Sequence, residues 1–361
     1  MLRSRFPTAH HFTVSVFGCQ YHAEAPDAAK SKLIESFDKL IDQDAIFVEH
    51  LEQNDLPSKI WMSYWESPQK FKQWWEKADT SAFWASLPDD AGFWRETFSL
   101  PATRAMYEGT GKGPYGFGHC GSLSPLTTKT GYWGAYRSRM TPDFEGDTFS
   151  SPLPTYANQE PVSEKIRPGR VKITDFPDNL CMVVEGQVYG AMEERERDYW
   201  NENFDGLTKE WVTNVVTAGT EQGMVIARAC HGFGVEKKLG ATSKSGIFPG
   251  LDYLRQAQIL IWQDISKMEH MGRYDKTHVT LRRNFMKAYG PGGEMEGGDL
   301  LLWVDLGILK KDEIDAEYVG CYENTGFLKL DKGQFFKVEA VEASKLPPFF
   351  DNPVESKPIE W

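Results

Sequence analysis

The sequence predicts an α+β fold in which one β-α-β-β-α unit occurs twice in a single chain. Apolar residues follow strand-like and helix-like spacings in the same order in both halves of the chain. A stretch rich in Pro, Ser and Gly separates the halves, and short segments of one half match segments at corresponding places in the other. The length of 361 residues usually accommodates more than one folding unit.

The first half, residues 1–141, begins with the strand-like run HFTVSVFGCQY. A helix is predicted in AAKSKLIESFDKLID, because its apolar residues recur at helical spacing. The strand-like runs IFVEHLE and KIWMSYW follow, and a second helix is predicted in PQKFKQWWEK, with its aromatic residues on one face. This half therefore contains one complete β-α-β-β-α unit.

Residues 142–170 form the boundary between the halves. Five of the chain's 20 prolines lie between Pro142 and Pro168, and the segment has no sustained apolar period. Such a composition is typical of a linker or a long surface loop.

The second half, residues 171–361, repeats the order with a strand in NLCMVVEGQVY, a long helical segment in EERERDYWNENFDGLTKEWVTNVV, strands in GMVIARACHGF and QILIWQD, and a helix in ISKMEHMGR. FGCQY corresponds to EGQVY, and Trp65 to Trp262. Each half is thus predicted to be a ferredoxin-like unit. We expect the two repeats to pack as a dimeric-type α+β barrel within one chain.

Composition and charge exclude several classes of function. With 40% apolar and 25% charged residues, the chain is typical of a soluble globular protein. The net charge is −12 without any block of Lys and Arg, so we expect no nucleic-acid partner. There is no apolar run of membrane-spanning or signal-peptide length, which predicts a cytoplasmic protein without membrane contact. The five cysteines are widely spaced without CxxC pairs, which argues against a disulfide framework or a structural zinc site.

One histidine lies where a helix should bury apolar side chains. In YDKTHVTLRRNF, His278, Leu281 and Phe285 share one helical face. Such a histidine is most often a hydrogen-bonded core residue, but an axial haem ligand needs the same surroundings. With Trp65 matched to Trp262, His278 corresponds to Ser81, so the histidine occurs in one repeat only and a function is favoured. The chain has no CxxCH motif, so any haem would be bound non-covalently.

Six segments in order along the chain resemble the haem-containing aldoxime dehydratases: FGCQY, IWMSYWESP, GYWGAYRSR, DNLCMVVEGQ, KTHVTLRRNF and VGCYENTGFL. The resemblance implies a duplicated ferredoxin-like barrel with ferrous haem b, whose iron is bound by His278, the metal ligand, on a helix that also presents Phe285 to the porphyrin. It further implies a lyase that converts a small-molecule aldoxime to a nitrile and water. In that family a distal histidine exchanges the protons, assisted by an arginine and a serine.

At these distal positions the chain departs from the family pattern. Val304 corresponds to the histidine and Val184 to the arginine, so both valines are expected beside the haem. Cys230 corresponds to the serine, with a shift of one residue left open. A valine cannot transfer a proton, so other residues must replace the distal set. The candidate catalytic residues are Arg228, Cys230 and His231; on a strand, the first two share one face and His231 points to the other.

Two alternatives to an aldoxime dehydratase remain open at this stage. The same haem site would suit an enzyme that acts on another N–O or N–N substrate. An apolar distal side would also suit a haem-binding or gas-sensing protein without turnover. The sequence does not determine the oligomeric state, and a homodimer is compatible with it.

Overall fold

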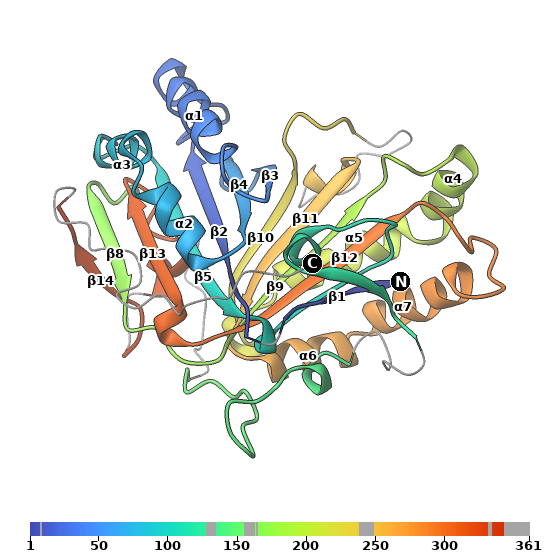
Figure 1. Cartoon of the computed structure of the whole chain (residues 1–361). Coiled ribbons are helices and arrows are strands. Elements are labelled where there is room, and N and C mark those ends of the chain that lie inside the picture. Colours follow the sequence, from blue (N-terminus) through green and yellow to red (C-terminus); the bar gives the residue numbers. More distant parts are fainter. Residues whose placement is uncertain are drawn as a thin grey trace.

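One large antiparallel sheet dominates the computed structural model, which describes residues 1–7, 9–127, 135–154, 163, 165–237, 249–330 and 334–342. Within these residues the fourteen strands lie in the order β14-β8-β13-β5-β2-β4-β3-β10-β11-β9-β12-β6-β1-β7. Figure 1 shows the sheet curving strongly, with helices on the two halves of its outer face. The mixed α and β architecture agrees with the prediction.

The elements predicted in the first half form close to their expected bounds. They are β2 (His11–Gln20), α1 (Ala28–Ile41), β3 (Phe47–Gln53), β4 (Ser58–Trp65) and α2 (Pro68–Trp75). The helix α3 (Ala78–Ala85) and the strand β5 (Phe93–Pro101) follow them and were not predicted. Asp27 caps α1 by accepting a hydrogen bond from the Lys30 amide at 2.8 Å. Ser67 caps α2 in the same way, with Pro68 at the first helical position.

The second half contains β9 (Leu180–Val188), α4 (Glu194–Asn203), α5 (Asp205–Val216), β10 (Met224–Gly232), β11 (Arg255–Trp262), α6 (Ile265–Tyr274), α7 (Lys276–Tyr289) and β12 (Leu301–Leu309). The helical segment expected over residues 193–216 is divided at Phe204, whose φ of −129° is not helical. Its ring stacks on Trp200, with 4.9 Å between the ring centroids. Burial of Phe204 fixes the corner between α4 and α5.

Strand order is the same in the two halves. It is β5-β2-β4-β3 in the first half and β12-β9-β11-β10 in the second, and β3 pairs with β10 where the halves meet. The fourth strand of each half, β5 and β12, was not among the predicted elements. Each is paired with the first strand of its own half, β2 or β9.

Additional strands extend the sheet beyond β5 and β12 and interweave the two halves. On the β5 side lie β13 (Ile314–Val319), β8 (Arg170–Thr174) and β14 (Lys337–Ala340); on the β12 side lie β6 (Ala105–Gly109), β1 (Leu2–Arg5) and β7 (Ser122–Pro125). The strand β13 thus pairs with the first half, and β6 pairs with the second.

The curved sheet has an inner face shared by both halves and an outer face covered by helices. On the inner face, the Tyr64 hydroxyl donates a hydrogen bond to the Asp305 carboxylate at 3.2 Å, which joins β4 to β12. On the outer face, α1, α2 and α3 cover the first half, while α5, α6 and α7 cover the second (Figure 1). No helix in the described ranges combines the length and apolarity needed to cross a membrane.

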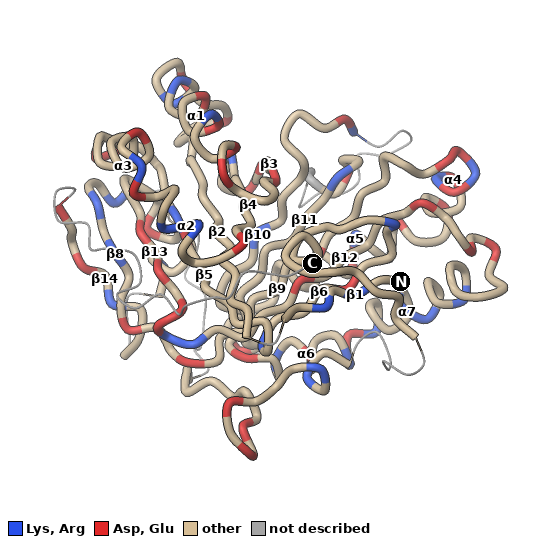
Figure 2. The backbone as a smooth tube through the Cα atoms, viewed as in Figure 1, with Lys and Arg blue, Asp and Glu red and all other residues tan. Residues whose placement is uncertain are grey.

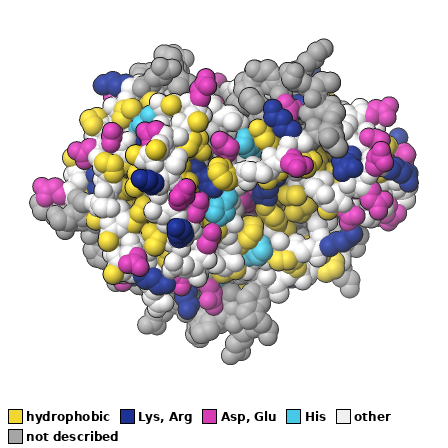
Figure 3. Space-filling model, turned by 90° about the horizontal axis from the view of Figure 1, so that it is seen from above, with side chains coloured by type: hydrophobic (Ala, Val, Ile, Leu, Met, Phe, Trp, Pro, Cys, Tyr) yellow, Lys and Arg dark blue, Asp and Glu magenta, His cyan; other side chains and the backbone are white. Residues whose placement is uncertain are grey.

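Charges of both signs are interspersed along the backbone (Figure 2). The face in Figure 3 likewise has Lys and Arg scattered among Asp, Glu and apolar side chains. All five cysteines are buried with free thiols.

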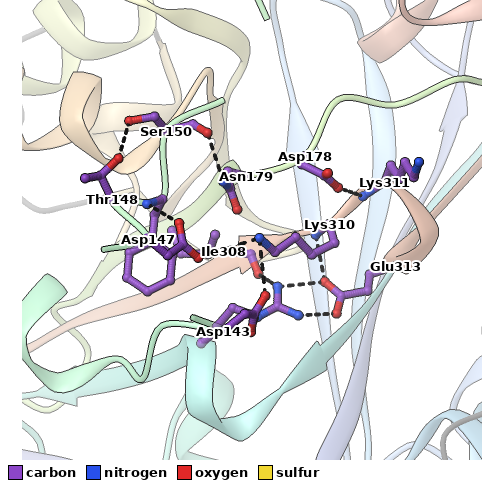
Figure 4. Close-up of polar contacts among 12 residues, drawn as sticks. Asp143, Asp147, Thr148, Ser150, Asp178, Asn179, Ile308, Lys310, Lys311 and Glu313 are labelled. Atoms are coloured by element: carbon purple, nitrogen blue, oxygen red, sulfur yellow. Dashed lines mark hydrogen bonds and ion pairs between the residues drawn. The ribbon is translucent and has the colours of Figure 1, made fainter. Parts of the chain in front are cut away.

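The first part of the segment between the halves is fastened to the second half by polar contacts (Figure 4). Lys310 forms ion pairs with Asp143 at 3.3 Å and with Asp147 at 3.9 Å. The Asn179 side-chain amide donates to the Ser150 carbonyl at 2.9 Å. Of the predicted linker, residues 155–162 and 164 lie outside the described residues.

Candidate functional site

A cavity of about 540 Å³ lies between the sheet of the second half and the helices α5, α6 and α7. Its volume is in the range of small-molecule and cofactor sites. Most of its lining is apolar or aromatic. The sheet contributes Val183, Glu185, Gly186, Gln187, Leu260, Trp262, Leu302, Trp303, Val304 and Leu306, and the α5–α7 helices contribute Thr208, Trp211, Val215, Met268, Glu269, Met271, Gly272, Arg273, His278, Leu281, Arg282 and Phe285.

His278 lies in the first turn of α7, and its ring borders the cavity. Asp275 caps this helix by accepting a hydrogen bond from the His278 amide at 2.8 Å. The imidazole Nδ1 lies 2.6 Å from the Gly272 carbonyl oxygen. Since a carbonyl oxygen only accepts, Nδ1 carries the proton, and the lone pair of the neutral ring is on Nε2. Burial lowers the pKa of His278, which favours this neutral form.

Aromatic and aliphatic side chains surround the imidazole. The Trp211 ring stacks on it with 4.2 Å between the centroids and 27° between the planes. Leu281 and Phe285 follow on the same face of α7 and line the same cavity. The helical face predicted for His278, Leu281 and Phe285 therefore borders a cavity large enough for a ligand.

The opposite wall of the cavity is the sheet, and it includes one carboxyl side chain. Glu185 on β9 is adjacent in register to Val304 on β12 and to Gln258 on β11. Its Oε1 is inaccessible to solvent and has no hydrogen-bond partner. Burial raises the pKa of Glu185 to about 7, against the effect of a hydrogen bond with Trp211.

Cationic side chains contribute a further part of the lining. Arg273 and Arg282 lie on α6 and α7, and Glu269 on α6 forms an ion pair with Arg137 at 3.0 Å. The cavity thus combines apolar walls, one neutral imidazole and guanidinium groups that suit an anionic substituent.

Of the four residues predicted to contact a cofactor, three line the cavity and one does not. His278, Phe285 and Val304 are in the lining. Val184 instead packs into the core on the inner face of the sheet. Side chains alternate along a strand, so the cavity receives its neighbours Val183 and Glu185. The expectation that Val184 would border the haem is corrected on this point.

The three predicted catalytic residues lie outside the cavity. Arg228 forms a buried ion pair with Glu96, at 2.7 and 2.9 Å, on the inner face of the sheet. Cys230 lies in the same inner core, where burial raises the pKa of its thiol. His231 points to the other face, as the alternation predicted, but stacks on Tyr253 with 3.8 Å between the centroids. The structure brings none of these side chains to His278.

Glu185 is the functional candidate that sequence reasoning missed. The signal was present in CMVVEGQ, where a carboxylate follows four apolar residues in a buried strand. The family resemblance matched Val184 to the family's arginine, and the neighbouring Glu185 was not considered. The pairing of β9 with β11 and β12 determines whether the side chain of Val184 or that of Glu185 points into the cavity.

Residues 15–327 match the family model for haem-containing dehydratases. The chain belongs to this family. It is 24% identical over 301 residues to the phenylacetaldoxime dehydratase of Bacillus sp. (strain OxB-1), a match that covers 81% of this chain and 78% of that relative. A crystal structure of an aldoxime dehydratase in complex with butyraldoxime superposes with a TM-score of 0.72 at 16% identity, covering 91% of this chain and 88% of the other. A second aldoxime dehydratase structure gives 0.70 at 18% identity, covering 91% and 90%.

The haem of this dehydratase family fits the cavity. Among the described residues, no three His, Cys, Asp or Glu side chains are grouped to hold a metal ion by themselves. An iron bound by His278 would therefore need further ligands from a porphyrin, and the apolar walls suit the faces of that ring. The imidazole already has the tautomer in which Nε2 is available to a metal, with Nδ1 held by a carbonyl.

Proposed function

We propose that this haem-containing dehydratase binds haem b through His278 and converts an aldoxime to a nitrile and water. The observation that carries the proposal is His278, which lines a cofactor-sized apolar cavity while its Nδ1 donates to the Gly272 carbonyl and so leaves the lone pair on Nε2. Leu281 and Phe285, which line the cavity from α7, would then contact the porphyrin. The reaction class is supported by the similarity to phenylacetaldoxime dehydratase.

The reaction removes hydroxide from nitrogen and a proton from carbon, so R–CH=N–OH becomes R–C≡N and water. When bound, ferrous haem supplies an iron that can accept the oxime nitrogen and weaken the N–O bond. The chain must hold the cofactor, exclude water and provide a group that exchanges protons at the leaving oxygen and at the carbon. Val304 contributes to water exclusion at the sheet wall.

Arg273 and Arg282 are the expected partners of the haem propionates. Both line the cavity from α6 and α7, and guanidinium groups bind carboxylates with two parallel hydrogen bonds. In that arrangement the two arginines would hold the propionates from the helix side, and the sheet wall would be left to the substrate.

The substrate is a small neutral aldoxime. A solved relative was crystallised with butyraldoxime, and the curated relative is named for phenylacetaldoxime. The four tryptophans Trp200, Trp211, Trp262 and Trp303 in the cavity lining suit an apolar alkyl or aryl substituent.

We further infer that the two halves, 1–141 and 171–361, are ferredoxin-like repeats joined by the linker 142–170. Their equivalent strand orders support this, and so does a shared detail. Gly18 pairs with Trp94 in the first half, and Gly186 pairs with Trp303 in the second. A cytoplasmic location agrees with the five free thiols. We also propose a homodimer, which a measurement of the molecular mass in solution would test.

The proposed function is tested by an absorption spectrum of the haem-loaded, dithionite-reduced protein under anaerobic conditions, before and after addition of phenylacetaldoxime or butyraldoxime. We expect a shift of the haem bands and release of the nitrile, measured by chromatography. A spectral shift without any nitrile would contradict the reaction and leave only the haem site.

The ligand is tested separately with the His278→Ala variant. We expect a folded protein that no longer retains haem, because one side chain provides the protein's bond to the iron. His270→Ala is the matched control, since His270 is exposed on the neighbouring helix α6. Full haem retention and an unchanged spectrum in His278→Ala would overturn the assignment.

A further inference from the structure

We propose that Glu185 is the proton-exchanging group of this active site, in place of a distal histidine. The inference rests on the proposed function, because it assigns a residue to the acid–base step of aldoxime dehydration. It depends on three observations: the side on which Glu185 stands, the lack of a partner for one of its oxygens, and the engagement of the other charged groups nearby.

Glu185 stands on the cavity wall that faces the substrate side of a haem held by His278. His278 projects from α7, and the sheet strands β9, β11 and β12 form the opposite wall. A planar ring bound through His278 between these walls would have the sheet on the side away from the histidine. Glu185 is the carboxyl residue that the sheet contributes to the described lining of the cavity.

A row of adjacent residues crosses the sheet at this level. Gln258, Glu185, Val304 and Glu108 lie side by side on β11, β9, β12 and β6. Neighbouring strands are roughly 5 Å apart, so Glu185 lies beside the valine at the position where the family pattern predicts a histidine. An acid–base group at Glu185 on β9 would therefore lie close to the position that the family's distal histidine has on the neighbouring strand β12.

Glu185 is free to act on a ligand in a way that its neighbours are not. Its Oε1 is shielded from solvent and has no hydrogen-bond partner. Glu108, at the far side of Val304, also has one unpartnered oxygen, but it forms an ion pair with Arg139 and is not in the cavity lining. Glu269 forms an ion pair with Arg137. Gln258 next to Glu185 is fully buried with an unpartnered side-chain amide, so it can support the carboxyl group but cannot exchange a proton.

The surroundings keep this carboxyl group poised between its two protonation states. Burial raises the pKa of Glu185 to about 7, while the hydrogen bond with Trp211 favours the carboxylate. An acid–base group works best when its pKa is close to the operating pH. Trp211 also stacks on His278, so one indole contacts both the iron ligand and the proposed acid–base residue.

The proposed step balances without an added oxidant or reductant. Neutral Glu185 gives its proton to the oxime oxygen as the N–O bond breaks, and the oxygen leaves as water. The resulting carboxylate takes the proton from the aldoxime carbon, and the C–H electron pair becomes the additional C–N bond of the nitrile. Glu185 is then neutral again, so one residue completes the cycle.

The test compares Glu185→Gln with wild type in the haem-loaded protein. The amide has the same shape as the carboxyl group but does not exchange protons. We expect unchanged haem content, an aldoxime dissociation constant from the spectral shift within about threefold of wild type, and kcat for nitrile formation lowered by ~10²–10⁴-fold. Glu202→Gln, the same change at an exposed position on α4, should behave as wild type.

A second readout uses haem-free protein and requires no turnover. Infrared difference spectra between acid and neutral pH should contain C=O bands of buried carboxylic acids, among them Glu108 and Asp305, whose pKa values burial also raises. One of these bands should be absent in Glu185→Gln and present in Glu202→Gln. If Glu185→Gln fails to fold, the Glu185→Asp variant retains the carboxyl group one methylene further from the substrate. It should keep haem and aldoxime binding and lose most of kcat.

The outcomes separate this inference from the proposed function. Wild-type nitrile formation with an equal kcat in Glu185→Gln would overturn the assignment of Glu185 and leave the dehydratase activity standing. A wild-type protein that binds aldoxime without forming nitrile would overturn both. Loss of aldoxime binding at unchanged kcat in Glu185→Gln would show that Glu185 only positions the substrate, which also contradicts the proposal.

Discussion

Two side chains on opposite walls of one cavity account for the chemistry that we propose for this protein. The Nε2 of His278 is unprotonated because its Nδ1 donates to the Gly272 carbonyl, and Glu185 on the sheet wall has one oxygen without a hydrogen-bond partner. Neither property belongs to the residue type alone. The first depends on a backbone carbonyl six residues earlier, and the second on the register of β9.

At the residue scale, His231 makes a pH-dependent contribution to stability that is separate from catalysis. Burial lowers its pKa to about 4, from 6.5 in an unfolded chain. The unfolded state therefore binds the additional proton between these values, so stability falls as the pH decreases from 6.5 to 4. Between about pH 7 and pH 5 we expect wild type to lose roughly 2 kcal/mol through this residue, a loss that His231→Gln should not show.

Urea denaturation of the haem-free protein at the two pH values measures this difference. His270→Gln, at an exposed position, serves as the control and should follow wild type. An identical pH dependence in His231→Gln and wild type would contradict the assignment of the loss to His231.

The sequence predicted the part of the candidate site that depends on local spacing within one helix. The spacing of His278, Leu281 and Phe285 predicted the cavity-facing side of α7 directly, because a helical period is local. The opposite wall depends on which of two neighbouring side chains faces the helices. That choice between Val184 and Glu185 is set by pairing with strands more than 70 residues away, so periodicity alone could not make it.

At the element scale, the junction of α6 and α7 positions His278, the proposed iron ligand. Asp275 ends one helix and caps the next, accepting from the His278 amide at 2.8 Å and from the Asn214 side chain at 3.0 Å. Gly272 in the last turn of α6 provides the carbonyl for the imidazole. The two short helices thus act as one support for a single ring.

Removing this cap should affect both stability and cofactor affinity. We expect Asp275→Ala to lower the free energy of unfolding by about 1 kcal/mol, the usual cost of losing an N-cap acceptor. Because His278 lies in the first turn, its orientation should loosen and haem affinity should fall. Urea denaturation and haem titration measure the two effects.

Asp275→Asn is the matched variant, since its amide oxygen still accepts a hydrogen bond at the cap. It should restore most of the stability and of the haem affinity. Unchanged haem affinity in Asp275→Ala would show that the first turn of α7 holds His278 without this cap.

At the scale of the whole molecule, the two halves share a constraint at equivalent strands. A Cβ atom added at Gly18 would lie 2.2 Å from the Trp94 ring, and one added at Gly186 would lie 2.1 Å from the Trp303 ring. In each half a tryptophan on the fourth strand thus covers a glycine on the first. The sequence match of FGCQY with EGQVY contains these two glycines.

Alanine at either glycine should destabilise the protein by roughly 1–3 kcal/mol, the usual cost of overpacking. Only Gly186→Ala should also weaken haem binding, because Gly186 and Trp303 border the cavity and Gly18 does not. Thermal unfolding and haem titration of the two variants make the comparison. Equal haem affinities of Gly18→Ala and Gly186→Ala would contradict the expectation that only the second half contacts the haem.

The architecture was more predictable than the connections that complete it. The apolar periods of β2, α1, β3, β4 and their counterparts were strong because each element covers one side of a core. The pairing of β13 with β5 and of β6 with β12 joins strands distant in sequence, and local pattern has no information about such partners. The break between α4 and α5 at Phe204 could not be predicted from periodicity either, because a buried aromatic residue at a helix break has the same apolar character as a core residue within a helix.

The four tryptophans around the cavity give the protein an optical property of its own. Haem absorbs light in the range where indole emits, so energy transfer should quench Trp200, Trp211, Trp262 and Trp303 when the cofactor enters, and most strongly Trp211 beside His278. Loading can then be followed in time by intrinsic fluorescence, without a label. The first half has tryptophans of its own, such as Trp61 and Trp74, which are outside the cavity lining and should be quenched less.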